Sequence, residues 1–331
     1  MKSVLTLLAI VPFLFYGCKK GESTETDPKE KLYQVTLKTS GLEQSIRPLN
    51  LKTSSANTAK SMSDIENPDN PTGIDFLIYG KDGLVKQIHS SFYNVNGTPI
   101  TGADQIKLEL PTGKYSVYAL AYNGYFGDFY WEDTTVENFY FNFNHTVQGA
   151  STHVINYCSI FRNPNKLVAF EVGETPVTAN IQLSRFNSKI EFKVTGIIPN
   201  HVDYILLQGP HSKDVLLHSP TTINTGSTTG YLRLNVNDIR NQQEKILSSI
   251  FYPRAYSTDK VSKPENFEIQ YFDKENKILG RRAVKDVIFK EGHITRLSGD
   301  LFGSIDNPSG SASIKVDIIK DYNNSIINKD L

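Results

Sequence analysis

The sequence predicts an all-β protein built from two tandem β-sandwiches. Apolar and polar residues alternate in many short runs, which is the pattern of strands that bury one face. The 331 residues include 17 Tyr and 18 Phe but only 2 Met, and aromatic side chains suit a pleated surface. Turn residues separate the runs and convincing long helical patterns are absent, so sandwiches are the expected architecture.

Alternating runs place the strands. A period of two residues is found at Val35–Leu37, Ile106–Leu110, Ile190–Val194 and Leu232–Val236. The run Tyr115–Tyr122 is apolar on both faces, which predicts a central strand that is covered on both sides.

Turn chemistry connects these runs. Pro111 to Gly113 predicts a hairpin between the strands on either side, and Asp273 to Asn276 predicts another. Residues 51–72 are rich in Ser, Asn, Asp and Lys and predict a long loop. The best short helix candidate is Val236–Leu247, with Asn237 as its cap.

The N-terminus has the features of an export signal. Lys2 precedes an apolar run from Val4 to Tyr16, which as a helix would cover roughly 20 Å and is too short to span a bilayer. The run ends at Gly17-Cys18, an arrangement that resembles a bacterial lipoprotein signal. We therefore expect residues 1–17 to be removed and Cys18 to be acylated; a plain signal peptide with an accidental cysteine is the alternative.

A polar segment follows the cysteine. Residues 18–31 are predicted to be a flexible tether, and Lys19 stands where an inner-membrane retention signal would place Asp, which favours the outer membrane. Domains are expected at 32–172 and 173–331, because Gly173 and Pro176 interrupt the strand pattern. With Cys18 acylated, Cys158 has no partner for a disulfide and is expected to be a buried thiol in a strand.

Composition and spacing exclude several functions. The formal charge is zero, so nucleic acid is not an expected partner. No metal or other cofactor is expected, because His201, His211 and His218 lack the spacing of compact metal motifs. Acidic pairs such as Glu268 with Asp273, or Asp128 with Asp133, arise by chance among 35 acidic residues. No catalytic residue is assigned, and an enzyme is not expected.

Aromatic residues crowd one stretch and leave an alternative open. The cluster consists of Tyr122, Tyr125, Phe126, Phe129, Tyr130 and Trp131. Exposed rings of this kind can stack on sugars, so a glycan-binding lipoprotein of a polysaccharide-uptake system is the second hypothesis. The favoured interpretation is that the rings fill the core of a sandwich.

Several segments together resemble the fimbrillin superfamily of Bacteroidota, in particular its FimB-type anchor or minor subunits. Their order and spacing extend over most of the mature chain, and the segments are Ile74–Gly83, Leu110–Tyr115, Ile181–Ile190, Gly292–Leu297 and Gly299–Gly303. The resemblance implies two transthyretin-like β-sandwiches, a lipid-anchored place at the cell surface, at the base or tip of a fimbrium, and other fimbrial subunits as partners. It leaves open a host or glycan ligand.

The same resemblance implies assembly by strand donation, in which a strand of one subunit fills a groove in the next. Stalk subunits of the family lose their first strand to an arginine-specific protease. Here that strand is expected at Leu32–Lys38, with a possible continuation to Leu49, and the nearby Arg47 is followed by Pro48, which normally blocks such cleavage. An unprocessed anchor fits better than a processed stalk subunit, and a tip position stays open.

The C-terminal segment supplies a candidate contact. Ile314, Val316 and Ile318 alternate with Lys315 and Asp317 and predict an edge strand. One hypothesis is that this strand pairs with a neighbouring subunit; the favoured alternative is that it completes the second sandwich.

Overall fold

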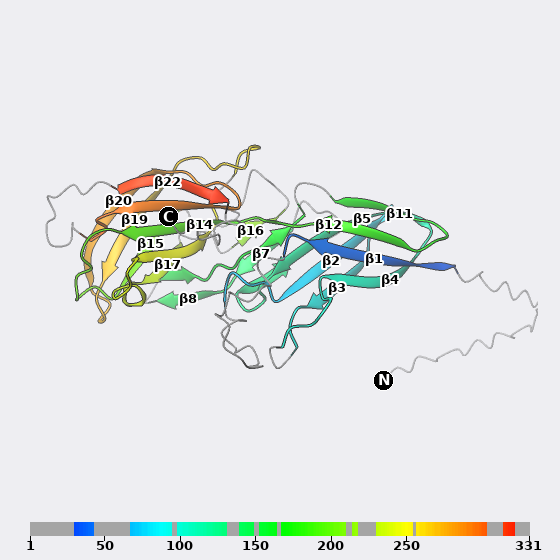
Figure 1. The fold of residues 1–331 in the computed structure, drawn as a ribbon, viewed down its shortest axis with the longest axis horizontal. Coiled ribbons are helices and arrows are strands. Elements are labelled where there is room, and N and C mark those ends of the chain that lie inside the picture. The colour runs from blue at the N-terminus through cyan, green and yellow to red at the C-terminus, as the bar shows by residue number, and fades with distance from the viewer. Residues whose placement is uncertain are drawn as a thin grey trace, which may run out of the picture. The chain divides into compact units, whose positions relative to one another are not determined.

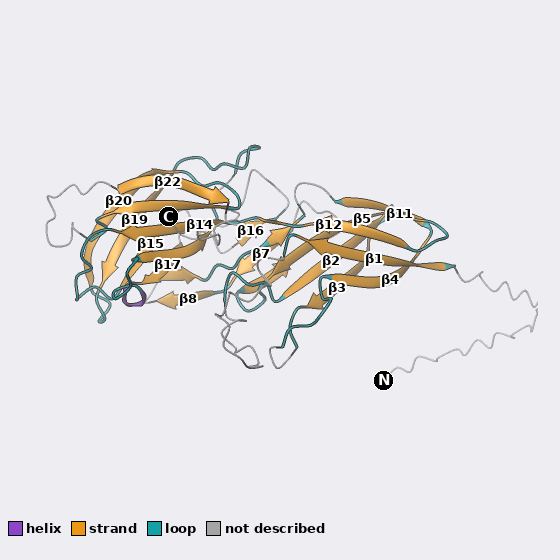
Figure 2. Cartoon of the chain, in the orientation of Figure 1, coloured by secondary structure: helices purple, strands orange, loops and turns teal. Residues whose placement is uncertain are grey.

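A computed structural model describes residues 30–42, 67–94, 98–130, 139–148, 152–163, 167–209, 214–217, 230–253, 256–302 and 314–321. The chain divides into two compact units, Met1–Lys31 and Leu32–Leu331, and every strand below belongs to the second. Strands make up nearly all of the regular structure that is described, which confirms the all-β class (Figures 1 and 2).

The elements in chain order are β1 (Leu32–Ser40), β2 (Gly73–Gly80), β3 (Gly83–Ser91), β4 (Gln105–Pro111), β5 (Gly113–Tyr122), β6 (Gly127–Tyr130), β7 (Tyr140–Phe143), β8 (His145–Gln148), β9 (Thr152–Ile155), β10 (Phe161–Arg162), β11 (Val168–Val172), β12 (Val177–Gln182), β13 (Ser184–Arg185), β14 (Ser188–Val194), β15 (Tyr204–Gln208), β16 (Asp214–Leu216), β17 (Gly230–Asn235), the 3-10 helix η2 (Val236–Asp238), β18 (Ile246–Phe251), β19 (Glu265–Phe272), β20 (Ile278–Val287), β21 (His293–Gly299) and β22 (Ile314–Asp321).

Two sheets form the first sandwich. Sheet I has the order β12–β1–β4, and sheet II has the order β13–β10–β5–β2–β3, with β11 also paired to β5. Alternate residues of each sheet meet in the core between them, so that Val35 and Leu37 of β1 share a cluster with Phe76 and Ile78 of β2. The alternation predicted for Val35–Leu37 is therefore confirmed, because one face of β1 is buried.

Strands β2 and β5 are covered on both faces. In β5, Val117 and Ala119 belong to the core against sheet I, whereas Tyr118 and Leu120 belong to a second core on the opposite face. A strand in this position must be apolar on both sides. The prediction of a central strand at Tyr115–Tyr122 is confirmed.

The second sandwich continues this second core. Sheet III has the order β18–β14–β21–β22, sheet IV has the order β20–β19–β15–β17–β9–β8, and sheet V has the order β16–β7–β6. One cluster of buried residues joins Leu120 of β5 to Phe141 of β7, Phe192 of β14 and Ile269 of β19. The apolar interior is thus continuous from sheet II into the second sandwich.

Strands also cross the predicted domain limit. Strand β12 lies after Val172 but pairs with β1, in parallel, from Val35↔Val177 to Ser40↔Gln182. Strands β8 and β9 lie before that limit but belong to sheet IV. The limits 32–172 and 173–331 stay a prediction.

The Pro111–Gly113 hairpin prediction is wrong. Strand β4 pairs with β1 in sheet I, whereas β5 pairs with β2 in sheet II. The turn therefore carries the chain from one sheet of the sandwich to the other, and Tyr115 Oη donates a 3.2 Å hydrogen bond to the Pro111 carbonyl beside it. The Asp273–Asn276 hairpin is confirmed: it joins antiparallel β19 and β20, with Asn276 in the left-handed region at φ 64°.

The predicted helix Val236–Leu247 is also wrong. Only η2 forms, and β18 begins at Ile246 because it pairs with β14 along sheet III. Asn237 donates from its side chain to Asp203 and accepts from Arg240 instead of capping a helix. Long-range pairing has overridden a weak local preference.

Strand β1 ends where a glycine is required. Gly41 has φ +91°, and a Cβ there would lie 2.2 Å from the Leu183 carbonyl oxygen, so a side chain would be strained and would clash. The predicted continuation toward Leu49 lies outside the described residues after Leu42. Most of the predicted loop at 51–72 lies outside them as well.

Candidate functional site

The predicted C-terminal strand forms the edge of sheet III. Strand β22 is antiparallel to β21, with Ile314 opposite Gly299, Val316 opposite Leu297 and Ile318 opposite Thr295. Leu297 and Thr295 are buried. Val316 and Ile318 of β22 are therefore paired with buried residues of β21. Among the described strands, none pairs with the other side of β22, so β22 is the last strand of the described part of sheet III.

Strand β1, in contrast, is paired on both sides. It lies between β12 and β4, and its register runs from Leu32↔Pro111 to Lys38↔Gln105 on the β4 side. Val35 and Leu37 have no exposed surface. With β1 in place, the described part of sheet I has no open position between β12 and β4.

Two chain crossings lie side by side between the sandwiches. Residues 156–160 lead from β9 of sheet IV to β10 of sheet II, and residues 186–187 lead from β13 of sheet II to β14 of sheet III. The crossings meet where β10 pairs with β13, Phe161 opposite Arg185 and Arg162 opposite Ser184. We call residues 156–162 and 184–188 the joint.

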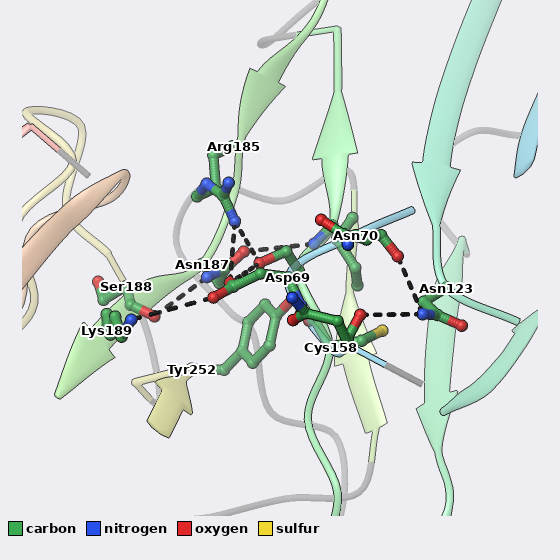
Figure 3. A network of polar contacts seen from close by, with 12 residues as sticks. Asp69, Asn70, Asn123, Cys158, Arg185, Asn187, Ser188, Lys189 and Tyr252 are labelled. Carbon is green, nitrogen blue, oxygen red and sulfur yellow. Dashed lines mark hydrogen bonds and ion pairs between the residues drawn. The ribbon is translucent and has the colours of Figure 1, made fainter. Parts of the chain in front are cut away.

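Side chains satisfy the buried backbone of the joint (Figure 3). The Ile160 amide donates to Asn187 Oδ1 at 3.3 Å, and Tyr252 Oη donates to the Cys158 carbonyl at 2.7 Å. Ile160 and Cys158 are fully buried. Because these residues lie outside a sheet, they need such partners in place of ladder hydrogen bonds.

A carboxylate holds the joint from the loop before β2. Asp69 Oδ1 accepts a 2.9 Å hydrogen bond from Ser159 Oγ and lies 3.4 Å from Arg185 Nη1, while its Oδ2 lies 3.9 Å from Lys189 Nζ (Figure 3). Asn123 Nδ2 donates to the carbonyl of Asn70 at 2.9 Å and fixes the same loop from the end of β5.

Two arginines and two phenylalanines stack reciprocally in the joint. The Arg162 guanidinium lies 4.0 Å from the centre of the Phe186 ring, and that of Arg185 lies 4.4 Å from the centre of the Phe161 ring. Both arginines are buried, where such contacts are strongest. Arg162 also donates to the Leu217 carbonyl. The joint is therefore built for a fixed connection between the sandwiches.

The predicted lipid attachment site, Cys18, lies outside the described residues. Cys158 is a buried free thiol, as predicted, but it follows β9 rather than lying in a strand. Burial raises the pKa of the Cys158 thiol to about 12, so the thiolate needed for reaction is scarce at neutral pH.

The described residues contain no group of three or more His, Cys, Asp or Glu side chains that could hold a metal ion. His201 lies in an exposed turn, and His211 and His218 lie outside the described residues. Among the described residues, no helix has the length and apolar character needed to cross a membrane.

The aromatic cluster divides between core and surface. Phe129 is buried, Tyr122 and Phe126 are half-buried against the core, and Tyr125 is 60% exposed. The side chains of Tyr130 and Trp131 lie outside what the structure describes. Tyr122 packs edge-on against Phe141 at 5.0 Å. The described rings other than Tyr125 thus pack as the core interpretation predicts, rather than as a sugar-stacking platform.

A small polar cluster lies on sheet II. His89 Nδ1 of β3 is 3.2 Å from Asp75 Oδ1 of β2, and Tyr122 Oη donates to Asp75 Oδ2 at 2.8 Å. The hydrogen bond to Asp75 raises the pKa of His89 above 6.5 against the opposing effect of burial. Burial, with the nearby Asp75 charge, raises the pKa of Tyr122 far above its usual value.

Sequence reasoning missed the joint. The sequence contains the pair Phe161-Arg162 and, in reverse order, the pair Arg185-Phe186. This reversed order was a feature of the sequence that could have indicated the joint. Their contact depends on the antiparallel pairing of β10 and β13, which no local pattern reveals.

Comparisons with known proteins were made on both sequence and structure. No protein-family model and no curated protein matches the chain. Similar solved structures include a candidate cell adhesion protein of Bacteroides eggerthii, 12% identical over 88% of this chain and 96% of that one, with a TM-score of 0.48. Candidate polysaccharide-binding proteins of Bacteroides thetaiotaomicron are 10% identical over 88% and 99%, with a TM-score of 0.47.

The fimbrial anchor protein Mfa2 of Porphyromonas gingivalis is also similar, at 11% identity over 88% of this chain and 100% of that one, with a TM-score of 0.44. Bacteroidota fimbrial proteins, the class that the sequence motifs resemble, are thus among the structural neighbours. Since these TM-scores are below 0.5, the function is inferred from the residues of this chain.

Replacing Asp69 by Ala should weaken the joint. The change leaves the buried Arg185 without this carboxylate, and we expect a loss of about 2 kcal/mol in the free energy of unfolding. Chemical denaturation measures it. The matched control is Asp82→Ala, whose ion pair with Lys81 is almost fully exposed and should contribute nothing measurable. Equal effects of the two changes would contradict the assignment.

The His89–Asp75 contact should make stability depend on pH. Because the pKa of His89 is raised in the folded state, its contribution is fully present below about pH 6.5 and is lost as the pH rises through the folded-state pKa. The stability difference between the wild type and His89→Gln should therefore shrink from pH 5.5 to pH 8.5. Urea denaturation at both values measures this; a difference that grows with pH would refute it.

Proposed function

We propose that this protein is a lipid-anchored structural subunit of a cell-surface fimbrium, of the anchor or minor type, and that it has no catalytic role. The observation that carries the proposal is the place of β22 as the last of the described strands of sheet III. A strand of another subunit could extend the sheet there through main-chain hydrogen bonds, the usual means by which strands join proteins.

The paired state of β1 supports an anchor over a stalk subunit. Strand donation needs an empty position in a sheet, but β1 already fills the place between β12 and β4. Its core residues Val35 and Leu37 are completely buried. A chain that keeps β1 would present only an edge and would begin or end a fimbrium rather than continue it.

The N-terminal sequence supports attachment to the outer membrane. Acylation of Cys18 with more than one chain would give lasting membrane binding. From Cys18 to Leu32 an extended chain spans at most about 50 Å. The sandwiches would then stay close to the cell surface.

The joint supports a mechanical role. A fimbrial subunit must transmit tension from its anchor to its partner, here from β1 near the tether to β22 in sheet III. Buried hydrogen bonds in the joint and one continuous core connect sheet II, which packs against β1, with the second sandwich.

Site-specific photo-crosslinking tests the contact at β22. A photo-reactive amino acid placed at Lys315 in the native host should form an adduct with another fimbrial subunit, identified by mass spectrometry. The matched control is the same probe at Lys107, an exposed position of β4 at an edge of sheet I, which should form none. Equal adducts at both positions, or none at Lys315 in assembled fimbriae, would contradict the proposal.

A further inference from the structure

Strand β1 is the element through which tension on the N-terminus enters the first sandwich. The N-terminal segment joins β1 directly at Leu32. Nine residues of strand cover about 30 Å. The strands on either side of β1 therefore decide how firmly it resists being drawn out along its own axis.

The partner of β1 on one side runs in the same direction and leads into the joint. Six residues of β1 pair in parallel with β12, from Val35↔Val177 to Ser40↔Gln182. Strand β12 is followed, after one residue, by β13 and then by the crossing at residues 186–187 that enters the second sandwich. Tension between the tether and the second sandwich thus pulls β1 at its first residue and β12 at its last.

Parallel strands that are pulled at opposite ends are sheared. All hydrogen bonds of the ladder then resist at the same time, whereas a pull on adjacent ends opens the ladder one pair after another. The antiparallel ladder between β1 and β4 has seven pairs, from Leu32↔Pro111 to Lys38↔Gln105, and it must break as β1 slides out. Sheet I is therefore loaded in the direction in which its pairing is strongest.

The side chains of β1 also oppose sliding. Val35 and Leu37 have no exposed surface, and Thr39 is 3% exposed on the same face of the strand. A slip of one residue would turn these side chains toward solvent and would turn Thr36 and Lys38 toward the core. Strand β1 cannot move past β12 in small steps, so the whole register has to break at once.

The last residues of β1 are fastened on both sides. The Leu183 amide donates to the Ser40 carbonyl at 2.9 Å, and Ser40 Oγ donates to Gln182 Oε1 at 2.8 Å. On the other side, the amide and Oγ1 of Thr39 both donate to the Asp104 carbonyl, at 2.9 and 2.8 Å. These hydrogen bonds lie at the end of β1 nearest to β13 and the joint, and they add to the resistance of the two ladders.

We infer that the parallel ladder between Val35–Ser40 of β1 and Val177–Gln182 of β12 is a mechanical latch. It holds the tether to the protein by shear when the N-terminus is under tension. The inference rests on the proposed function, because membrane attachment through the N-terminus is the source of the tension. It gives the retained strand β1 a task that a subunit without this strand could not perform.

Single-molecule force spectroscopy on the mature chain, made without its lipid, tests the latch. Cys18 carries one handle, because the buried Cys158 thiol is unreactive. The second handle is attached at the exposed position of Asn200→Cys, beyond β14, or of Glu174→Cys, just before β12. The first choice loads β1 and β12 at opposite ends and the second loads them at adjacent ends. Because forced unfolding reports the unfolding barrier, the unfolding force should be about twofold higher through position 200 than through position 174.

A proline in β1 tests the ladder itself. Thr36→Pro removes a backbone N–H from the middle of the strand and should lower the unfolding force through position 200 about twofold. The matched control is Gln87→Pro in the middle of β3, which pairs with β2 and lies outside the latch; it should leave this force unchanged. If Thr36→Pro does not fold, the comparison of the two handle positions decides.

The outcomes separate the latch from the proposed function. Equal forces through positions 200 and 174, or a lower force through position 200, would overturn the latch and leave the proposed function standing. Absence of acyl groups on the chain from its native host would instead contradict the proposed function, and the mass of the chain shows this independently of any force. Equal melting temperatures of the two cysteine variants show that the handle positions leave folding unaffected.

Discussion

The joint between the sandwiches is the constraint on which the rest of the structure depends. Two chain segments cross there outside any long strand, so their buried backbone groups need side-chain partners. Asn187 and Tyr252 supply these partners, and Asp69 ties the loop before β2 to the same place. Joint residues belong to both cores, Phe161 to that of the first sandwich and Ile160 and Phe186 to the second, so a change in the joint reaches both.

The buried arginine charges of the joint are stabilised more by stacking on phenylalanine rings and by hydrogen bonds than by ion pairs. The buried Arg162 lies against the Phe186 ring and donates to a carbonyl oxygen, and no described carboxylate lies within ion-pair distance of it. Arg185 shares Asp69 with Lys189. Stacked guanidinium groups are planar and weakly hydrated, so they tolerate burial better than ammonium groups do. A connection of this kind suits a protein whose proposed role is to hold tension.

The strands with a clear local pattern could be predicted from the sequence, as the alternation at Val35–Leu37 and the apolar run at Tyr115–Tyr122 show. The Asp273–Asn276 hairpin could also be predicted, since its turn residues act within a few positions. Pro111–Gly113 has the same turn chemistry, yet it joins two sheets, because partners far along the chain decide which strands pair. The same reason explains why the helix predicted at Val236–Leu247 does not form: residues from Ile246 onward pair with β14 as strand β18. Of the candidate site, the strand at Ile314–Ile318 was predictable, whereas the joint depends on long-range contacts.

We propose that the protein remains attached to the membrane and keeps its own first strand. The most direct measurement is the mass of the mature chain, purified from outer membranes of the native host. We predict a mature chain that begins at an acylated Cys18 and retains β1 intact. A chain that begins after Arg47, without acyl groups, would contradict it, because loss of β1 would open sheet I to a donated strand and make the protein a polymerising subunit.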